Sequence, residues 1–279
     1  MEFQKSVIEL IETRKSSRTY QDGEIVPETW QKLKDYVDLI NQDVNIKARF
    51  ILASRRVKGE DQAIKLGTYG IIAGANQFII GILDRDEKKA NAFGYLFEKI
   101  ILKATDLGLQ TCWLGGTFKK KDFNQISHLH ENEYIAIVSP VGYSKRKQRI
   151  LESAMRAFAG SNHRKPWSEL FFEGAAEVPL KDASAGAYLL PLAMLRLSPS
   201  ASNKQPWRVI KDKNAYHFFL CRTKGYWVTY FDMQENDIGI ARCHFELTAS
   251  ELGLKGMWQS VKTVEHPQHW EYITSWIMK

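Results

Sequence analysis

Cysteine is scarce in this chain, with 3 residues among 279. The three lie far apart, which excludes a disulfide framework and a cysteine-rich zinc fold; they are Cys112, Cys221 and Cys243. Long apolar runs are also missing: the most hydrophobic stretch, 66–83, contains Asn76, Gln77 and several glycines, and makes a poor membrane span. The opening stretch lacks the features of a signal peptide. We therefore expect a cytoplasmic protein that has no membrane partner.

Neither sign of charge dominates. The chain has 39 Lys and Arg against 32 Asp and Glu, a net charge of +7, and 44% hydrophobic residues. These are ordinary globular values, which exclude a disordered chain or a fibre. The densest basic clusters, 119–121 and 145–149, are not interleaved with aromatic residues and belong to no nucleic-acid-binding module. We expect solvated loops there, or contact with the phosphate of a cofactor, and no nucleic-acid partner.

Hydrophobic periodicity predicts helices that alternate with strands. Apolar residues recur at helical spacing in 3–11, 30–40 and 93–104, and a helix beginning near Asp182 is expected to kink at Pro191. The predicted strands are 48–53, 77–83, 134–141, 207–210, 215–220 and 272–277. This alternation predicts a protein of the α/β or α+β class.

An internal echo suggests that the chain is duplicated. Segments 93–113 and 238–258 align without gaps, and both contain Leu-Gly-Leu followed by a tryptophan, Trp113 or Trp258. Chance similarity between two amphipathic helices would explain part of this match, but duplication explains the shared ending as well. We therefore predict two related halves, 1–165 and 166–279, that form one intertwined unit.

Two basic segments are candidates for binding an anion. The first, 14–18, reads Arg-Lys-Ser-Ser-Arg and follows a predicted helix. Forked guanidinium donors and short hydroxyls are what a fully ionised phosphate requires. The second, 142–146, follows a predicted strand, and its Lys145 or Arg146 could reach a phosphate or the electron-rich edge of a ring. On its own, a basic segment such as 14–18 is more often a solvated loop, and 142–146 is equally compatible with one.

A proline-rich loop at 198–207 is a candidate for contact with a flat ring. Pro199 and Pro206 fix its backbone, while Asn203 and Gln205 offer carboxamides beside Trp207. A rigid loop with amide donors and acceptors suits the edge of a heterocycle. The plainer interpretation is a connection between a helix and a strand.

Paired glycines end the segment 111–116. Gly115 and Gly116 would let a ligand approach the backbone closely. The corresponding positions of the second repeat hold Ser260 and Val261. Loss of the pair from one copy suggests that the other copy uses it.

Together these segments resemble the FMN-dependent nitroreductases, in particular a divergent branch in which one chain carries both halves of the usual dimer. The resemblance covers nearly the whole chain, and it implies an α+β fold with an α/β sandwich architecture. It rests on four motifs: RKSSR (14–18), LGLQTCWLGG (107–116), GYSKR (142–146) and PSASNKQPW (199–207). The pairing of the first motif with the last is the most specific of these signals.

The resemblance implies an FMN site built from both halves. At the phosphate it implies Arg14, Lys15, Ser16, Arg18, Lys145 and Arg146. At the isoalloxazine ring it implies Pro199, Ser200, Ala201, Asn203 and Gln205, with the backbone amides of Leu114, Gly115 and Gly116 facing the N5–O4 edge. In the family the two loops come from opposite subunits, and here they come from opposite halves.

The departures from the family pattern are equally informative. The first half has no PSAxNxQPW string, and the second half has neither RxSxR nor the glycine pair. One complete flavin site can therefore be assembled in each chain, where an ordinary dimer has two. This arrangement permits a monomer and leaves a homodimer open.

The implied chemistry takes place on flavin N5, which would accept hydride from NAD(P)H and pass electrons to a nitroaromatic, quinone or similar small molecule in a ping-pong cycle. No protein acid, base or metal ligand is required, and the sequence contains no HExxH motif or P-loop. One alternative is a flavin-binding storage or sensor protein with little turnover. Another is an anion-binding or nucleic-acid-binding protein that uses its basic surface, in which case binding would depend strongly on salt.

Overall fold

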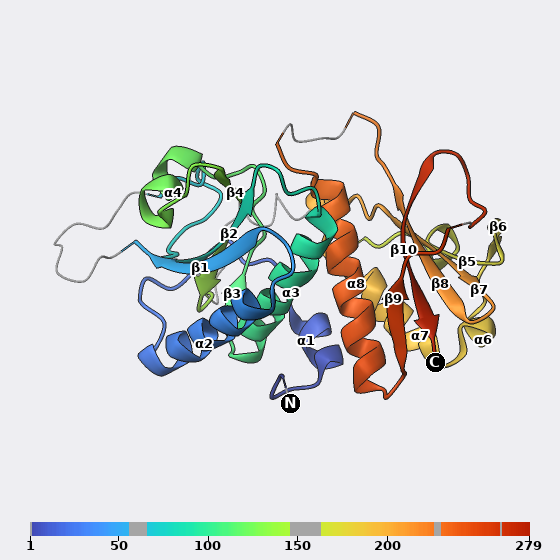
Figure 1. The fold of residues 1–279 in the computed structure, drawn as a ribbon. Helices are drawn as coiled ribbons and strands as arrows, with labels where there is room; N and C mark the ends of the chain where they lie inside the picture. Colours follow the sequence, from blue (N-terminus) through green and yellow to red (C-terminus); the bar gives the residue numbers. More distant parts are fainter. Residues whose placement is uncertain (1, 56–65, 146–162, 226–229, 263) are drawn as a thin grey trace.

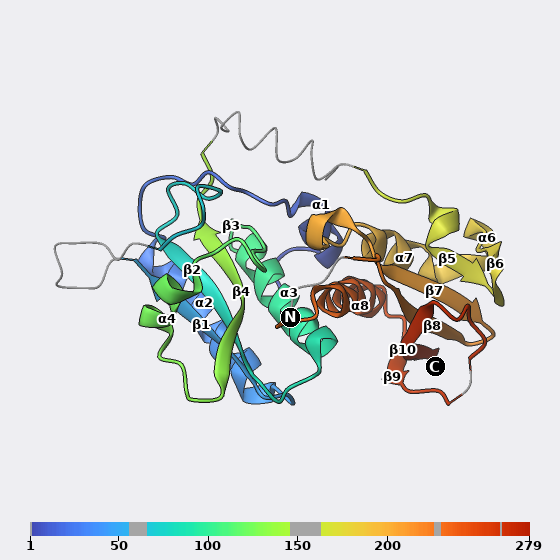
Figure 2. The same ribbon diagram turned by 90° about the horizontal axis from the view of Figure 1, so that it is seen from above.

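The computed structural model describes residues 2–55, 66–145, 163–225, 230–262 and 264–279. Two β-sheets lie on either side of a pair of long helices, α3 and α8 (Figures 1 and 2). The elements up to residue 142 are α1 (Val7–Thr13), α2 (Pro27–Asp43), β1 (Ala48–Ser54), β2 (Gln77–Asp84), α3 (Ala90–Asp106), β3 (Gln110–Thr111), α4 (Lys120–Ser127) and β4 (Glu133–Gly142).

The second sheet is built from the later part of the chain. Its strands and the associated helices are η1 (Trp167–Glu169), β5 (Phe171–Glu173), β6 (Ala175–Pro179), α6 (Asp182–Ala185), η2 (Gly186–Tyr188), α7 (Leu189–Arg196), η3 (Ala201–Asn203), β7 (Trp207–Asp212), β8 (Ala215–Cys221), α8 (Met233–Glu251), β9 (Gly256–Gln259) and β10 (Trp270–Met278). The predicted division at 165/166 falls between the last strand of the first sheet and the first strand of the second, and its exact place stays a prediction.

The two sheets repeat one topology. The first has the order β1-β2-β4-β3, and the second contains β7-β8-β10-β9, extended at one edge by β5 and β6. In each half the long helix lies in the chain between the first and the last two strands of this four-strand unit: α3 between β1-β2 and β3-β4, and α8 between β7-β8 and β9-β10. The predicted α+β class is confirmed, and the repeated strand order is what a duplicated chain would show.

Both faces of the first sheet are covered, which explains its apolar strands. On β2, Ile79 packs against α2 and α3, while Phe78 and Ile80 pack on the opposite face with Phe123 of α4. Successive side chains of a strand point to opposite faces, so burial on both faces requires a continuous hydrophobic run. The second sheet buries its inner face against α7 and α8 around Phe245.

Two glycines allow α3 and α8 to approach closely. A Cβ atom on Gly94 would lie 2.2 Å from the backbone oxygen of Asn236, and one on Gly239 would lie 1.9 Å from that of Asn91. Gly94 and Gly239 are equivalent in the echo, and Asn91 and Asn236 each lie two residues before it. The contact is therefore self-complementary, as at the two-fold interface of a homodimer.

The predicted helix beginning near Asp182 is the element that differs most from expectation. It is divided into α6, η2 and α7, and the division falls at Gly186, where φ is +54°. Pro191 is the third residue of α7, where a backbone N–H has no partner within the helix, so it causes no kink. The prediction of a kink at Pro191 was wrong.

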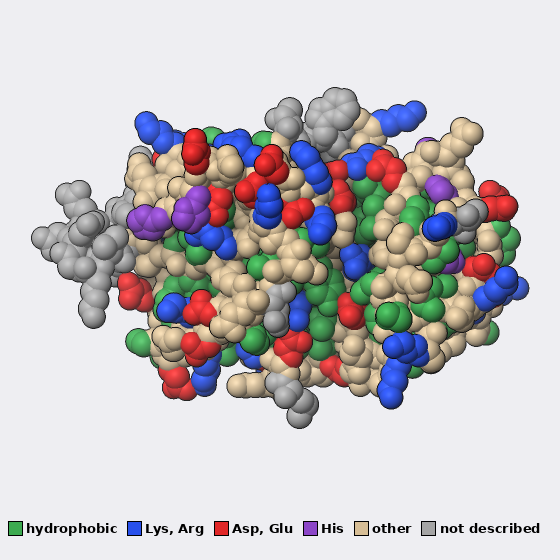
Figure 3. All heavy atoms as spheres, viewed as in Figure 1, with side chains coloured by type: hydrophobic (Ala, Val, Ile, Leu, Met, Phe, Trp, Pro, Cys, Tyr) green, Lys and Arg blue, Asp and Glu red, His purple; other side chains and the backbone are tan. Residues whose placement is uncertain are grey.

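The surface carries mixed charge on the face drawn in Figure 3. Lysine and arginine side chains there lie among aspartates and glutamates and do not form a continuous basic stripe. Among the residues that the structure describes, no helix has both the length and the apolar character needed to cross a bilayer.

Candidate functional site

The first basic segment runs beside two of the other predicted segments. The amide of Ser17 donates to the carbonyl oxygen of Thr111 at 2.9 Å, and the amide of Lys145 donates to the carbonyl oxygen of Thr19 at 3.0 Å. Segment 14–18 therefore lies along β3 and against the end of β4. Lys145 and Lys15 are exposed. Arg146, also predicted here, lies outside the described residues.

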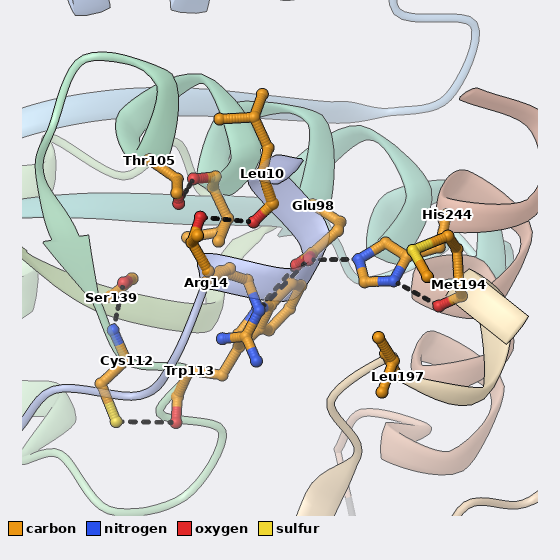
Figure 4. Close-up of polar contacts among 12 residues, drawn as sticks. Leu10, Arg14, Glu98, Thr105, Cys112, Trp113, Ser139, Met194, Leu197 and His244 are labelled. Atoms are coloured by element: carbon orange, nitrogen blue, oxygen red, sulfur yellow. Dashed lines mark hydrogen bonds and ion pairs between the residues drawn. The ribbon is translucent and has the colours of Figure 1, made fainter. Parts of the chain in front are cut away.

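Arg14 is the buried cation of this segment. It follows α1, its side chain is 7% exposed, and its Nε lies 3.9 Å from Oε1 of the fully buried Glu98 on α3 (Figure 4). Within the described part of the chain, its Nε and Nη1 atoms have no hydrogen-bond partner. Buried guanidinium donors that lack acceptors are costly, so these atoms mark a place where an anion would be stabilised.

Arg164 is a second guanidinium at this site, and the sequence analysis missed it. Its Nη1 donates to Oδ1 of Asn203 at 3.2 Å and its Nη2 to the carbonyl oxygen of Leu197 at 3.1 Å. Burial, and then the positive charges of Arg14 and Arg196, lower its pKa. The fold thus concentrates positive charge where the two halves meet. The only sequence signal was the cationic pair Arg164-Lys165 before a proline.

Loop 198–206, the PSA loop, has an unusual backbone. Ser202, Asn203 and Gln205 have φ values of +48°, +53° and +51°. Residues other than glycine rarely adopt this left-handed backbone region. One hydrogen bond within the loop and one to α8 hold it: the amide of Gln205 donates to Oγ of Ser200 at 2.9 Å, and the amide of Ala201 donates to Oδ2 of Asp237, also at 2.9 Å. Such backbone conformations cluster at binding sites.

The carboxamides of the PSA loop hold the segment that enters the second half. Asn203 Nδ2 donates to the carbonyl oxygen of His163 at 2.8 Å, and Gln205 Oε1 accepts from the amide of Lys165 at 2.8 Å. These groups were predicted to border a ring. In the structure they also fix Arg164 next to the loop, so any contact with a ligand must use their remaining capacity.

One glycine of the pair, Gly115, has a packing role that the sequence did not reveal. A Cβ on Gly115 would lie 2.3 Å from Cε of Met233 at the start of α8, and the hydroxyl of Tyr230 donates to the Gly115 carbonyl oxygen at 2.7 Å. Gly116 has open space where its side chain would be. Leu114 is buried and pairs with Val138. Gly115 therefore makes room for the second half of the chain.

One face of α8 connects three of the four predicted segments: the glycine turn, the PSA loop and, through Glu98, the basic segment 14–18. Met233 touches Gly115, Asp237 binds Ala201, and His244 contacts Glu98, the neighbour of Arg14. Spacings of four and eleven residues place these side chains on the same face of a helix. They span roughly 16 Å along its axis. The anion-binding end and the PSA loop are thus held at fixed positions along one rigid element.

The buried carboxyl of Asp237 gives the loop a testable pH dependence. Burial raises its pKa well above the ordinary value, against the lowering effect of the Ala201 amide. Since the folded pKa exceeds the unfolded one, the native state retains a proton that the unfolded state releases. Stability is therefore lost as pH rises from roughly 4, the ordinary aspartate value, through the raised pKa.

We expect Asp237→Asn to remove this dependence. Asparagine has no proton to lose, and its side-chain oxygen still accepts from Ala201. In urea unfolding, the variant should be more stable than the wild type by about 1 kcal/mol or more at pH 8, and by less at pH 5. Asp86→Asn, at an exposed position, is the control and should show no such change. Equal pH responses of Asp237→Asn and the wild type would contradict the assignment.

Comparisons with known proteins agree with this architecture. Residues 6–249 match the model of the family described as "Putative TM nitroreductase". A "putative nitroreductase" from Thermotoga maritima is similar over 98% of this chain and 94% of its own, with 16% identity and a TM-score of 0.57. A nitroreductase family protein from Clostridium difficile matches 58% of this chain and 94% of its own, with 21% identity and a TM-score of 0.42. Among curated proteins, none matches.

The family match and the fold cover both halves of the site. The matched residues include Arg14 at one end and the whole PSA loop at the other. The likeness to the Thermotoga maritima structure extends over nearly the entire chain, so the arrangement of both sheets is shared. This chain belongs to the nitroreductase family of oxidoreductases.

Proposed function

We propose that each chain binds one FMN and acts as an NAD(P)H-dependent oxidoreductase on a small electron acceptor such as a nitroaromatic or a quinone. The observation that carries the proposal is the concentration of positive charge beside the PSA loop: Arg164 donates to Asn203 of that loop, and the charge of the buried Arg14 helps to lower the pKa of Arg164. Arg14 retains buried donors without hydrogen-bond partners among the described residues. A phosphate would satisfy these donors and offset the repulsion between the two cations.

The residues present fit an extended ligand with an anion at one end. Arg14, Ser16, Arg18 and Arg164 would hold the phosphate, and the PSA loop with the backbone at Gly115 and Gly116 would border the ring. When bound, FMN would supply the redox chemistry, taking hydride from NAD(P)H and passing electrons to the acceptor in ping-pong order. Exposed Lys15 and Lys145 would add long-range attraction for the phosphate.

The side chains of this protein would position the cofactor and would not exchange protons with it. α8 fixes the PSA loop through Asp237 and the glycine turn through Met233, so both are held before a ligand arrives. Such preorganisation lowers the entropic cost of binding. Because the site takes its parts from both halves, we propose that a single chain suffices and that no second subunit is needed to complete it.

A single spectroscopic experiment tests the cofactor and its reduction together. Purified protein is mixed with FMN, desalted, and its visible spectrum is recorded before and after anaerobic addition of NADH or NADPH. We expect a retained flavin spectrum that bleaches with one or both nucleotides and recovers when a quinone or a nitroaromatic is added. Retained flavin that never bleaches would instead favour a storage or sensor protein, and a colourless protein would contradict FMN binding.

If one chain forms the whole site, the dissociation constant for FMN should be the same at every protein concentration. Light scattering during a titration with FMN would report the assembly state at each concentration. A requirement for dimerisation before flavin is retained would contradict the proposal that one chain suffices. The measurement separates the cofactor assignment from the assembly assignment, because either can fail alone.

A further inference from the structure

Glu98 and His244 form a buried polar pair that joins the two halves. Glu98 lies on α3 and His244 on α8, and both are fully buried. His244 Nε2 lies 2.9 Å from Glu98 Oε1, and its Nδ1 lies 3.1 Å from the carbonyl oxygen of Met194 on α7 (Figure 4). The indole nitrogen of Trp113 donates to the other carboxyl oxygen, Oε2, at 3.0 Å. The proposed function assigns no role to this pair.

The hydrogen bonds fix where protons must be. A carbonyl oxygen only accepts, so Nδ1 of His244 carries a hydrogen and donates to Met194. The contact between Nε2 and Glu98 Oε1 then requires one further proton, shared by the two side chains. Since Trp113 donates to Oε2, the carboxyl of Glu98 is held in a single orientation. This orientation presents Oε1 to Arg14.

Arg14 is held through one end of its guanidinium group. Its Nε lies 3.9 Å from Glu98 Oε1, while its Nη1 is buried with no hydrogen-bond partner among the described residues. The carboxylate therefore draws the Nε edge towards α3 and leaves the outer nitrogen available for an anion. A planar guanidinium fixed at one edge has a defined direction of approach for a phosphate.

We propose that Glu98 and His244 are positioning residues that orient Arg14 for the phosphate of FMN; this inference rests on the proposed function. His244 belongs to the second half, so that half contributes to the phosphate end of the site as well as to the ring. The pair acts only through Arg14 and touches no ligand. Its removal should weaken binding of the phosphate and leave contacts with the ring unchanged.

The second half supplies a matched control. Glu246 on α8 accepts a hydrogen bond from the indole of Trp258 at 2.6 Å, as Glu98 does from Trp113. The two tryptophans are equivalent in the internal repeat. Glu246→Gln thus makes the same chemical change beside an equivalent tryptophan, without affecting Arg14.

The test compares FMN, riboflavin and inorganic phosphate. Riboflavin has the ring and the ribityl chain but no phosphate, so the ratio of the two flavin affinities isolates the phosphate contact. We expect Glu98→Gln to lower FMN affinity about 5- to 10-fold, equivalent to about 1–1.4 kcal/mol, and to leave riboflavin affinity unchanged. Phosphate should become a weaker competitor by the same factor. Glu246→Gln should change neither ratio.

The shared proton makes Glu98→Gln a clean change. The substitution removes the carboxylate charge and the shared proton together. The net charge of Arg14, residue 98 and His244 therefore stays the same. A loss of FMN affinity then reports orientation and not the total charge. His244→Gln, made in the other half, should lower the same FMN-to-riboflavin ratio, and it keeps the test decisive if Glu98→Gln does not fold.

The outcomes separate this inference from the proposed function. If the wild type binds FMN and both variants retain its FMN-to-riboflavin ratio, the positioning role is overturned and the function stands. If the wild type binds phosphate but not FMN, and the variants weaken phosphate binding, the positioning role stands and the function fails. If the wild type binds neither, both are overturned.

Discussion

Replacing Arg14 with glutamine is expected to weaken FMN binding about 100-fold, equivalent to about 2.7 kcal/mol. The side chain is almost completely buried, and its Nη1 has no hydrogen-bond partner among the described residues. Truncation of one partner of a buried, charge-assisted contact costs roughly 2–5 kcal/mol of binding free energy, because the other charge is left unpaired. Fluorescence quenching of FMN on titration with the protein would measure the loss.

Lys15 provides the control for Arg14. It is adjacent in the chain and carries the same charge, but it is exposed. Lys15→Gln should therefore lower FMN affinity by less than about 3-fold, the effect of a screened surface charge. Riboflavin should bind the wild type and Arg14→Gln equally. Equal losses in the two variants would show that total charge, and not the buried guanidinium, binds the phosphate.

The local elements could be predicted because each depends on its own segment. The strand at 77–83 and the helix at 93–104 follow from hydrophobic runs and spacing, and the structure places β2 and α3 there. The echo between 93–113 and 238–258 predicted a duplicated chain, and the repeated strand order is what such a chain would show. Short strands such as β3, with 2 residues, carry too little sequence for a pattern, and they form because a neighbouring strand pairs with them.

The candidate site could be predicted only where a motif was continuous in sequence. Arg14 was found because it lies in a dense basic segment. Arg164 was missed because its significance depends on the charge of Arg14, which lies 150 positions earlier in the chain. The Glu98–His244 pair has the same origin: each residue is an ordinary polar position on a helix until α3 and α8 pack together.

Gly115 shows how a correct residue can be chosen for an incomplete reason. The sequence suggested that a ligand approaches the glycine pair. The structure places Met233 where a Gly115 side chain would be and leaves open space beside Gly116. Since glycine permits any close approach, its presence does not identify what approaches. Only the packing of α8 against this turn distinguishes the two glycines.

A single methyl group at Gly239 is expected to destabilise the fold by about 3 kcal/mol or more, the upper end for an overfilled interface. The new Cβ would lie 1.9 Å from the backbone oxygen of Asn91, which cannot rotate away. Alanine is a better helix former than glycine by roughly 1 kcal/mol, so an open position would be stabilised instead. Thermal unfolding of Gly239→Ala should show a loss of roughly 6–12 °C in Tm.

The symmetry of the crossing gives this prediction its control. Gly94→Ala meets the same obstacle from the other helix, so the two single variants should lose similar stability. Once one methyl has forced α3 and α8 apart, the second encounters less overlap, and the double variant should lose less than the sum. Gly23→Ala, with nothing within 4 Å of its Cβ position, should change stability little. Additive losses would mean that the two glycines do not share one crossing, and the self-complementary contact would then be wrong.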